Sequence, residues 1–200
     1  MIDTVVFDLG GVLIDWNPRY LYRKLLPDEQ SIEEFLATVC TGEWNAQQDA
    51  GRPFAEGVEI LAAQWPEKRP LIEAFHTRWI EMIGGPISET VDILRTLRDQ
   101  GTPIYALTNW SAETFPLVTP TFDFLSWFIG IVVSGEEKLI KPDPAFYELL
   151  MQRYDLKPQQ LVFIDDSRPN IEAADKLGIT ALHFTSPQNL RNQLTDLGIM

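Results

Sequence analysis

The sequence predicts an α/β protein in which a parallel sheet is covered by helices on both faces. In the second half of the chain, short apolar, β-branched runs alternate with amphipathic helical patterns. A separate apolar run at residues 5–7 opens the chain and stops at Asp8, shortly before two glycines. Because strands that alternate with helices need crossover connections, neighbouring strands are expected to be parallel.

The elements follow one another from residue 88 onward. Helices are expected at residues 88–101, 143–154, 168–177 and 187–196, with a broken helical stretch at 111–126. Strands are expected at residues 102–107, 129–133, 161–164 and 180–184. Gly101 and Gly178 mark the ends of two helices, a position where glycine is common.

Residues 18–80 show a different pattern, with aromatic and aliphatic side chains at helical spacing. Prolines and glycines divide this region into several short helices. We therefore predict a Rossmann-like α/β core made of residues 1–15 and 87–200. Residues 16–86 are predicted to form a helical insertion between the first strand and the rest of the core.

The composition limits the classes of partner. The chain has 16 basic and 29 acidic residues, a net charge of −13, which argues against binding to nucleic acid or to anionic membranes. A small anionic substrate is compatible with this charge, because a local cation can dominate one pocket. Cys40 is the only cysteine and is expected to be a buried apolar residue. No membrane span and no signal-peptide pattern is present, so we expect a cytoplasmic protein. The sequence leaves the oligomeric state open.

Polar residues follow the predicted strands, at the edge of a parallel sheet where ligands bind. These residues are Asp8, Thr108, Asn109, Ser134, Lys141, Asp165 and Asp166. Three carboxylates placed together would raise one another's pKa unless a cation neutralises them, and oxygen ligands suit Mg²⁺. Such a cation could hold a phosphoryl group beside an attacking carboxylate, while a lysine and a hydroxyl stabilise the charge. Gly10 and Gly11 would let backbone N–H groups approach the same phosphoryl oxygens.

The motifs around these residues resemble the four motifs of the haloacid dehalogenase-like (HAD) hydrolase superfamily, in order, from residue 5 to residue 179. They are Phe-Asp-Leu-Gly-Gly-Val-Leu at 7–13, Leu-Thr-Asn at 107–109, Lys-Pro-Asp at 141–143 and Phe-Ile-Asp-Asp-Ser at 163–167. Each motif is weak alone, but four in the right order are a strong signal. The helical insertion resembles the cap domain of that family. Residues 168–174 resemble the corresponding run in small sugar-phosphate phosphatases and in the phosphatase domain of soluble epoxide hydrolases.

The resemblance implies a Mg²⁺-dependent phosphatase that acts on a small phosphorylated metabolite such as a sugar phosphate. Asp8 would be the nucleophile that becomes an aspartyl-phosphate, and Lys141 would pair with Asp8 and the phosphate. Thr108 and Asn109 would hold the phosphoryl oxygens.

The same resemblance implies a set of metal ligands. Asp8, the backbone carbonyl of Gly10 and Asp166 would bind Mg²⁺, with Asp165 as a further ligand or an outer partner. Gly10 departs from the family pattern, because phosphatases of the family usually carry an aspartate there as general acid and base. Such a group contributes about 10²–10⁴-fold to the rate, so the enzyme is expected to be slow unless another acid replaces it. Asp15 could do so only if the chain folded back, and is otherwise expected to be a hinge or polar capping residue.

Two other functions stay open at this stage. A 2-haloacid dehalogenase also uses an aspartate nucleophile, and Gly10 fits it, but the two acidic residues at 165–166 do not. A catalytically weak relative that holds a phosphorylated ligand is the other alternative. Candidate lining residues within the helical insertion, most of which could instead form its core, are Trp16, Arg19, Trp44, Arg52, Arg78 and Trp79. His76 and His183 are expected to be packing or surface residues.

Overall fold

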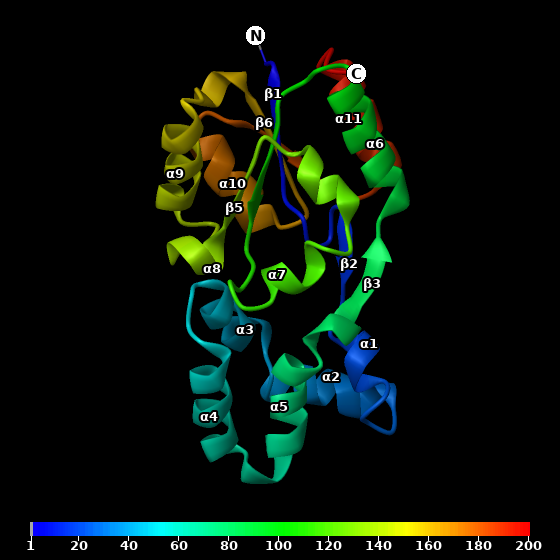
Figure 1. The fold of residues 1–200 in the computed structure, drawn as a ribbon, viewed down its shortest axis with the longest axis vertical. Coiled ribbons are helices and arrows are strands. Elements are labelled where there is room, and N and C mark those ends of the chain that lie inside the picture. Colours follow the sequence, from blue (N-terminus) through cyan, green and yellow to red (C-terminus); the bar gives the residue numbers. More distant parts are fainter. Residues whose placement is uncertain (1) are drawn as a thin grey trace.

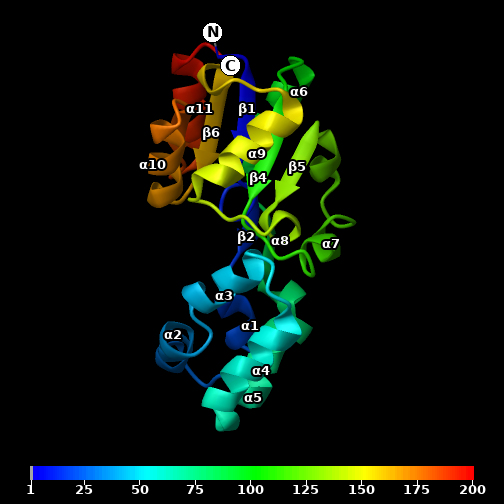
Figure 2. The ribbon, with the colours of Figure 1, turned by 90° about the vertical axis from the view of Figure 1, so that its left-hand side faces the viewer.

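The larger sheet of the protein is parallel and has five strands in the order β5-β4-β1-β6-β7. A computed structural model of the chain describes residues 2–200. The strands are β1 (Thr4–Phe7), β4 (Ile104–Thr108), β5 (Gly130–Val133), β6 (Leu161–Asp165) and β7 (Thr180–His183). The first strand of the chain lies in the middle, between β4 and β6 (Figure 2). The predicted parallel sheet is therefore confirmed.

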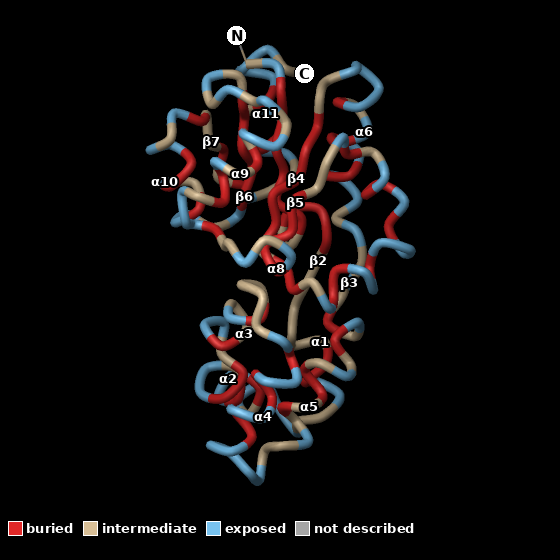
Figure 3. Tube along the Cα trace, turned by 60° about the vertical axis from the view of Figure 1, so that its left-hand side comes forward, coloured by how far each residue is buried: buried red, intermediate tan, exposed pale blue. Residues whose placement is uncertain are grey.

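Helices cover both faces of this sheet. They are α6 (Ser88–Asp99), α9 (Pro144–Tyr154), α10 (Arg168–Lys176) and α11 (Pro187–Asp196). Val5 and Phe7 of β1 belong to the same core as α6 and α11, whereas Val6 belongs to the core with α9 and α10. Its residues 5–7 are all apolar because successive side chains point to opposite faces that are both buried. Figure 3 shows the strands as the most buried part of the trace.

Short elements connect the strands at the two ends of the sheet. The stretch expected to be broken helix contains α7 (Phe115–Val118) and the 3₁₀ helix η3 (Asp123–Trp127). Helix α8 (Ser134–Glu137) follows β5 directly, and η4 (Pro158–Gln160) precedes β6. The loop that carries Lys141 runs between α8 and α9.

The sequence did not predict a second, antiparallel sheet, formed by β2 (Ile14–Trp16) and β3 (Ile83–Pro86). These strands are short, and the second one reads Ile-Gly-Gly-Pro, so neither carries a strand signal. Asp15 lies in this ladder and accepts a hydrogen bond from the Tyr20 hydroxyl at 2.6 Å. The boundaries predicted for the helical insertion, residues 16 and 86, fall within the ladder. The division of the chain into a core and an inserted domain stays a prediction.

The helices between β2 and β3 lie together beyond the carboxyl end of the large sheet (Figures 1 and 2). They are α1 (Arg19–Tyr22), α2 (Glu29–Thr38), α3 (Gly42–Asp49), α4 (Phe54–Gln64), η1 (Pro66–Lys68), α5 (Arg69–Thr77) and η2 (Trp79–Met82). Phe75 packs between Tyr22 and Trp44 in their aromatic core, and Cys40 is buried as expected. Within residues 2–200, no helix is long and apolar enough to cross a membrane.

Candidate active site

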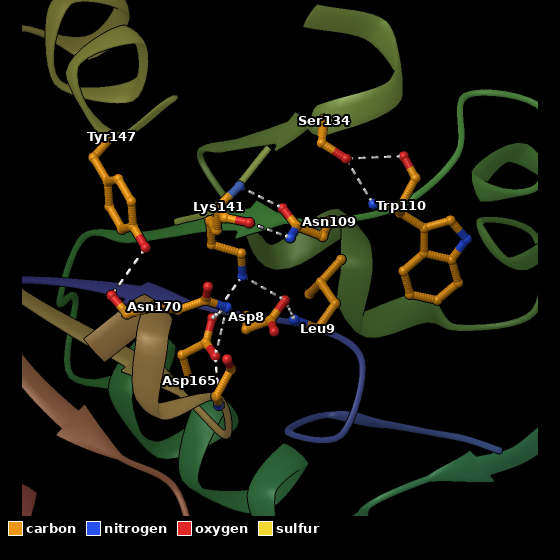
Figure 4. A network of polar contacts seen from close by, with 10 residues as sticks. Asp8, Leu9, Asn109, Trp110, Ser134, Lys141, Tyr147, Asp165 and Asn170 are labelled. Carbon is orange, nitrogen blue, oxygen red and sulfur yellow. Dashed lines mark hydrogen bonds and ion pairs between the residues drawn. The ribbon is translucent and has the colours of Figure 1, made fainter. Parts of the chain in front are cut away.

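The three central strands bring their carboxyl ends to one place. Asp8 directly follows β1, Thr108 ends β4 and Asp165 ends β6. Phe7 pairs in register with Ala106 of β4 and with Ile164 of β6, so the three strand ends lie level. The convergence that the sequence predicts for neighbouring strands is what the structure shows (Figure 4).

A buried ammonium group joins two of the carboxylates. The side chain of Lys141 is fully buried, and its Nζ lies 3.0 Å from Asp8 Oδ1 and 2.7 Å from Asp165 Oδ2. The backbone N–H of Leu9 donates a second hydrogen bond to Asp8 Oδ1, at 2.7 Å. Burial by itself would lower the pKa of Lys141, but Asp8 and Asp165 outweigh it and raise that pKa above its usual value. Lys141 is therefore a fixed positive charge beside Asp8.

Asp165 is held from three sides. Both of its oxygens accept hydrogen bonds from the Asn170 amide, at 3.0 and 3.1 Å, and Oδ1 also accepts from the Ser167 N–H at 2.8 Å. The Tyr147 hydroxyl in turn donates to the Asn170 carbonyl at 2.9 Å (Figure 4). Both Asp165 oxygens therefore already have donors within the protein, and one of these donors is the Lys141 ammonium.

Asn109 fixes the backbone of the loop that carries the lysine. Its Oδ1 accepts from the Lys141 N–H, and its Nδ2 donates to the Lys141 carbonyl, both at 2.9 Å. The neighbouring Thr108 hydroxyl is buried and has no hydrogen-bond partner within residues 2–200. Such an orphaned hydroxyl is what a phosphoryl oxygen could satisfy. The phosphoryl-binding roles of Thr108 and Asn109 stay predictions, and the observed contacts give Asn109 a positioning role as well.

Three carboxylates lie close enough to share one cation. Oxygens of Asp8, Asp165 and Asp166 all lie within 4.8 Å of one another. Burial raises the pKa of Asp8, and the nearby Asp165 and Asp166 raise it further, although Lys141 opposes them. Burial and Asp165 also raise the pKa of Asp166. With all three carboxylates ionised, the one ammonium of Lys141 would leave two negative charges unbalanced. A divalent cation supplies that charge, so the residues present fit Mg²⁺.

A cavity of about 380 Å³ opens over this cluster. Its lining residues come from the strand ends and from the helical insertion, and they are Asp8, Gly10, Gly11, Trp16, Asn45, Asp49, Trp79, Asn109, Trp110 and Asp166. Trp16 and Trp79 were among the candidate lining residues. The sequence reasoning missed Trp110, whose place directly after Asn109 was a usable signal. It also missed Asn45 and Asp49, which lie on a polar helix without any such signal.

The other candidate lining residues make contacts elsewhere. Trp44 donates from its ring nitrogen to the Gly57 carbonyl inside the helical insertion. The arginines are engaged in hydrogen bonds or ion pairs: Arg19 with Glu33, Arg52 with Gln48, and Arg78 with Glu81.

The two histidines also lie outside the cavity lining. His76 stacks on Phe54 and pairs with Glu113. A ring nitrogen of His183 lies 3.0 Å from the Asp166 carbonyl oxygen. Neither ring contacts Asp8.

The sequence model of the haloacid dehalogenase-like hydrolases matches residues 2–178 of the chain. The protein belongs to this family. The predicted resemblance is thus confirmed, and the chain is an enzyme of the hydrolase class. The four motifs that carried the prediction contribute Asp8, Asn109, Lys141 and Asp165 to one contiguous network of hydrogen bonds and ion pairs.

Two curated relatives of this haloacid dehalogenase-like hydrolase cover most of its length. A sesquiterpene phosphatase from Aspergillus oryzae is 29% identical over 183 residues, which are 91% of this chain and 89% of that protein. A phosphoglycolate phosphatase from Pectobacterium atrosepticum is 26% identical over 198 residues, 94% of this chain and 82% of that protein. Among solved structures, a HAD family enzyme from Bacteroides thetaiotaomicron in complex with magnesium and inorganic phosphate superposes with a TM-score of 0.71. It is 25% identical and covers 92% of this chain and 95% of its own.

Proposed function

We propose that this hydrolase is a Mg²⁺-dependent phosphatase that cleaves a small phosphomonoester through an aspartyl-phosphate on Asp8. The observation that carries this proposal is the group of three carboxylates around one buried lysine, at the floor of an open cavity. The two curated relatives named above are both phosphatases, which supports the same reaction class.

The contacts of Asp8 suit a nucleophile. Lys141 and the Leu9 N–H both bind Oδ1, and Oδ2 accepts no hydrogen bond from the residues that the structure describes. The carboxylate is thus held in one orientation with its second oxygen free. Attack of that oxygen on phosphorus forms the aspartyl-phosphate and releases the alcohol, and water then attacks the phosphorus and restores the Asp8 carboxylate.

Asp8, Asp166 and the carbonyl of Gly10 would hold Mg²⁺, with Asp165 as an outer partner. When bound, the ion would neutralise the phosphoryl oxygens and stabilise the ionised form of Asp8. Lys141 would stabilise the same oxygens, and the unpaired Thr108 hydroxyl would donate to one of them.

The cavity favours a small organic phosphate. A volume of about 380 Å³ accommodates a metabolite of sugar-phosphate size but no macromolecule. Trp16, Trp79 and Trp110 are among its lining residues, and an exposed indole face there could stack on the apolar face of a sugar. The net charge of −13 is unsuited to nucleic acid. A cytoplasmic location stays our prediction.

The test measures phosphate release from an aryl phosphate and a panel of sugar phosphates, with MgCl₂ or with EDTA. We expect the wild-type protein to release phosphate in MgCl₂ but not in EDTA. We expect the Asp8→Asn variant to release none in either. Acid quenching should trap one phosphoryl group on the peptide that contains Asp8, detected by mass spectrometry. EDTA-resistant halide release from 2-haloacids would instead identify a dehalogenase. Retention of a phosphorylated ligand without any turnover would identify a binding protein.

A further inference from the structure

The proposed reaction needs a general acid and base. The position that usually carries this group in the family is occupied here by a glycine. The leaving alcohol oxygen must gain a proton, and the attacking water must lose one. Gly10 has no side chain to do either. Asp15, the substitute considered from the sequence, lies in the β2–β3 ladder and does not line the cavity. Its carboxylate accepts a hydrogen bond from the Tyr20 hydroxyl.

Asp49 is the carboxylate that the helical insertion brings to the cavity. It is the last residue of α3 and lines the same cavity as Asp8 and Asp166. The Asn45 amide, one turn earlier on α3, donates to Asp49 Oδ2 at 3.0 Å. One carboxyl oxygen is therefore held in place. Asp8 belongs to the sheet side of the cavity and Asp49 to the helical side.

The backbone of Asp49 is tied to the strand ends. Its carbonyl accepts a hydrogen bond from the Ser134 hydroxyl, at the start of α8, at 2.5 Å. The same hydroxyl oxygen accepts from the Trp110 N–H at 2.8 Å, directly after the Asn109 position. Gly51, two residues later, has φ +97°, and a Cβ there would lie 2.9 Å from the Lys138 side chain. The chain can come this close to α8 only because Gly51 has no side chain. Asp49 is thus fixed relative to the phosphate site.

The surroundings of Asp49 favour its protonated form. No cation of residues 2–200 forms an ion pair with it, and it stands at the carboxyl end of a helix, where negative charge is disfavoured. Burial raises the pKa of Asp49 to about 7, partly opposed by a hydrogen bond from the Ser111 backbone. A carboxyl group with this pKa can both give and accept a proton near neutral pH.

We propose that Asp49 is the general acid and base of the reaction, supplied by the helical insertion in place of a side chain at position 10. This assignment rests on the proposed phosphatase function. In the first step, the bond from Asp8 oxygen to phosphorus forms while the ester bond breaks, and the Asp49 carboxyl proton passes to the leaving alcohol. In the second step, the Asp49 carboxylate takes a proton from water as it attacks phosphorus. The Asp8–phosphorus bond then breaks and inorganic phosphate forms.

The placement agrees with the direction of attack. In phosphoryl transfer, the attacking and leaving oxygens lie on opposite sides of phosphorus. With Asp8 on the sheet side, the leaving oxygen points toward the helical insertion. Figures 1 and 2 show α3 as the helix of the insertion that lies against the sheet's carboxyl end.

The first experiment compares Asp49→Asn with wild type on substrates of different leaving group. With an alkyl phosphate, the variant should lose about 10²–10⁴-fold in kcat, because the alcohol needs a proton to leave. With 2,4-dinitrophenyl phosphate, whose leaving group needs none, a burst of one phenolate per active site should persist, followed by slow turnover. Glu43→Gln, which removes an exposed carboxylate from the same helix, should behave as wild type on both substrates.

The second experiment asks whether a carboxylate at position 10 can take over. A Cβ on Gly10 would meet no atom within 4 Å, so Gly10→Asp can be accommodated. In the Asp49→Asn background, Gly10→Asp should restore at least about tenfold of the lost alkyl-phosphate turnover, within the range of general acid–base catalysis. Restored turnover also shows that the Asp49→Asn chain folds.

Failure of the assignment and failure of the proposed function give different results. A wild-type enzyme that releases no phosphate overturns the phosphatase function itself. An active wild type with an equally active Asp49→Asn variant overturns only the role of Asp49. A variant that loses the phenolate burst together with alkyl-phosphate turnover, and that Gly10→Asp does not restore, also overturns it, since Asp49 would then serve the structure alone.

Discussion

In the proposed reaction Asp8 must be ionised to attack phosphorus, yet its immediate surroundings oppose ionisation. Burial and two neighbouring carboxylates raise its pKa, and Lys141 is shared with Asp165. If Asp8 is the nucleophile as proposed, it needs a further positive charge, and a bound metal ion would supply that charge.

The two glycines after Asp8 differ in what they tolerate. Gly11 has φ +72°, and a Cβ there would overlap the Asp166 carboxylate, whereas a Cβ on Gly10 meets nothing within 4 Å. We expect Gly11→Ala to lower the free energy of unfolding by about 1–3 kcal/mol, because it adds left-handed backbone strain and displaces Asp166. Gly10→Ala should change it by less than about 1 kcal/mol. Urea unfolding of both variants measures the free energy of unfolding. Equal losses in the two variants would contradict the difference in backbone geometry.

Asp49 should make stability depend on pH. In the folded chain its carboxyl keeps a proton up to about pH 7, whereas its ordinary pKa is 3.8. Between these values the folded state binds more protons than the unfolded state, so the free energy of unfolding falls as pH rises, by at most about 1.4 kcal/mol per pH unit. Asp49→Asn should remove this part of the slope. Urea titrations in EDTA at pH 4 to 8 test it, and parallel curves for the two proteins would count against a raised pKa.

At the scale of elements, α8 connects the helical insertion to the sheet. Ser134 at its start accepts from the loop after β4 and donates to the end of α3, so one hydroxyl positions two walls of the cavity. Glu113 adds a second connection, since its carboxylate accepts from the Phe54 N–H at the start of α4. The cavity is therefore bounded by elements that are bonded to each other.

Replacing Ser134 should loosen this connection. Ser134→Ala leaves a backbone donor and a backbone acceptor without their partner, and we expect a loss of about 1–3 kcal/mol in stability. Faster amide exchange in α3 than in α9 should accompany it. Ser126→Ala, which removes an exposed hydroxyl bonded to Asp123, is the control and should stay within about 0.5 kcal/mol. Unchanged exchange in α3 would show that Ser134 does not anchor this helix.

At the scale of the whole molecule, the core is continuous. Buried residues of β1, α6 and α11 belong to the same apolar cluster as Tyr22, Phe35 and Phe75 in the helical insertion. The β2–β3 ladder bridges the two regions. Changes at the strand ends should therefore affect the stability of the entire chain.

Metal binding should raise the melting temperature of the whole protein. MgCl₂ at about 100 times its dissociation constant adds about 2.7 kcal/mol, which for a chain of this size is a shift of about 5–10 °C. Asp166→Asn should lose most of that shift, because it removes one of the carboxylates that would hold the ion. Asp175→Asn, an exposed position on α10, should keep it. The measurement is the melting temperature of each protein in MgCl₂ and in EDTA. If Asp166→Asn showed the same shift as wild type, the ion would bind elsewhere.

The sequence by itself determined the layered α/β fold, the family and the acidic residues at the strand ends. These follow from local patterns: apolar runs that alternate with helical ones, and motifs whose order places Asp8 and Asp166 directly after β1 and β6, with Lys141 in the loop between α8 and α9. Because all parallel strands present their carboxyl ends at one edge, position in the chain is enough to place such residues.

The tertiary structure alone decided which groups meet across the cavity. Asp49 belongs to the polar helix Gly-Glu-Trp-Asn-Ala-Gln-Gln-Asp, where it looks like one more solvated acid. The Asn109 amide, predicted to hold phosphoryl oxygens, also holds the backbone of Lys141, a contact that the sequence did not predict. What such side chains do depends on the element that packs opposite them. Which element packs there is determined by long-range contacts between the helical insertion and the sheet, and no local sequence pattern indicates these contacts.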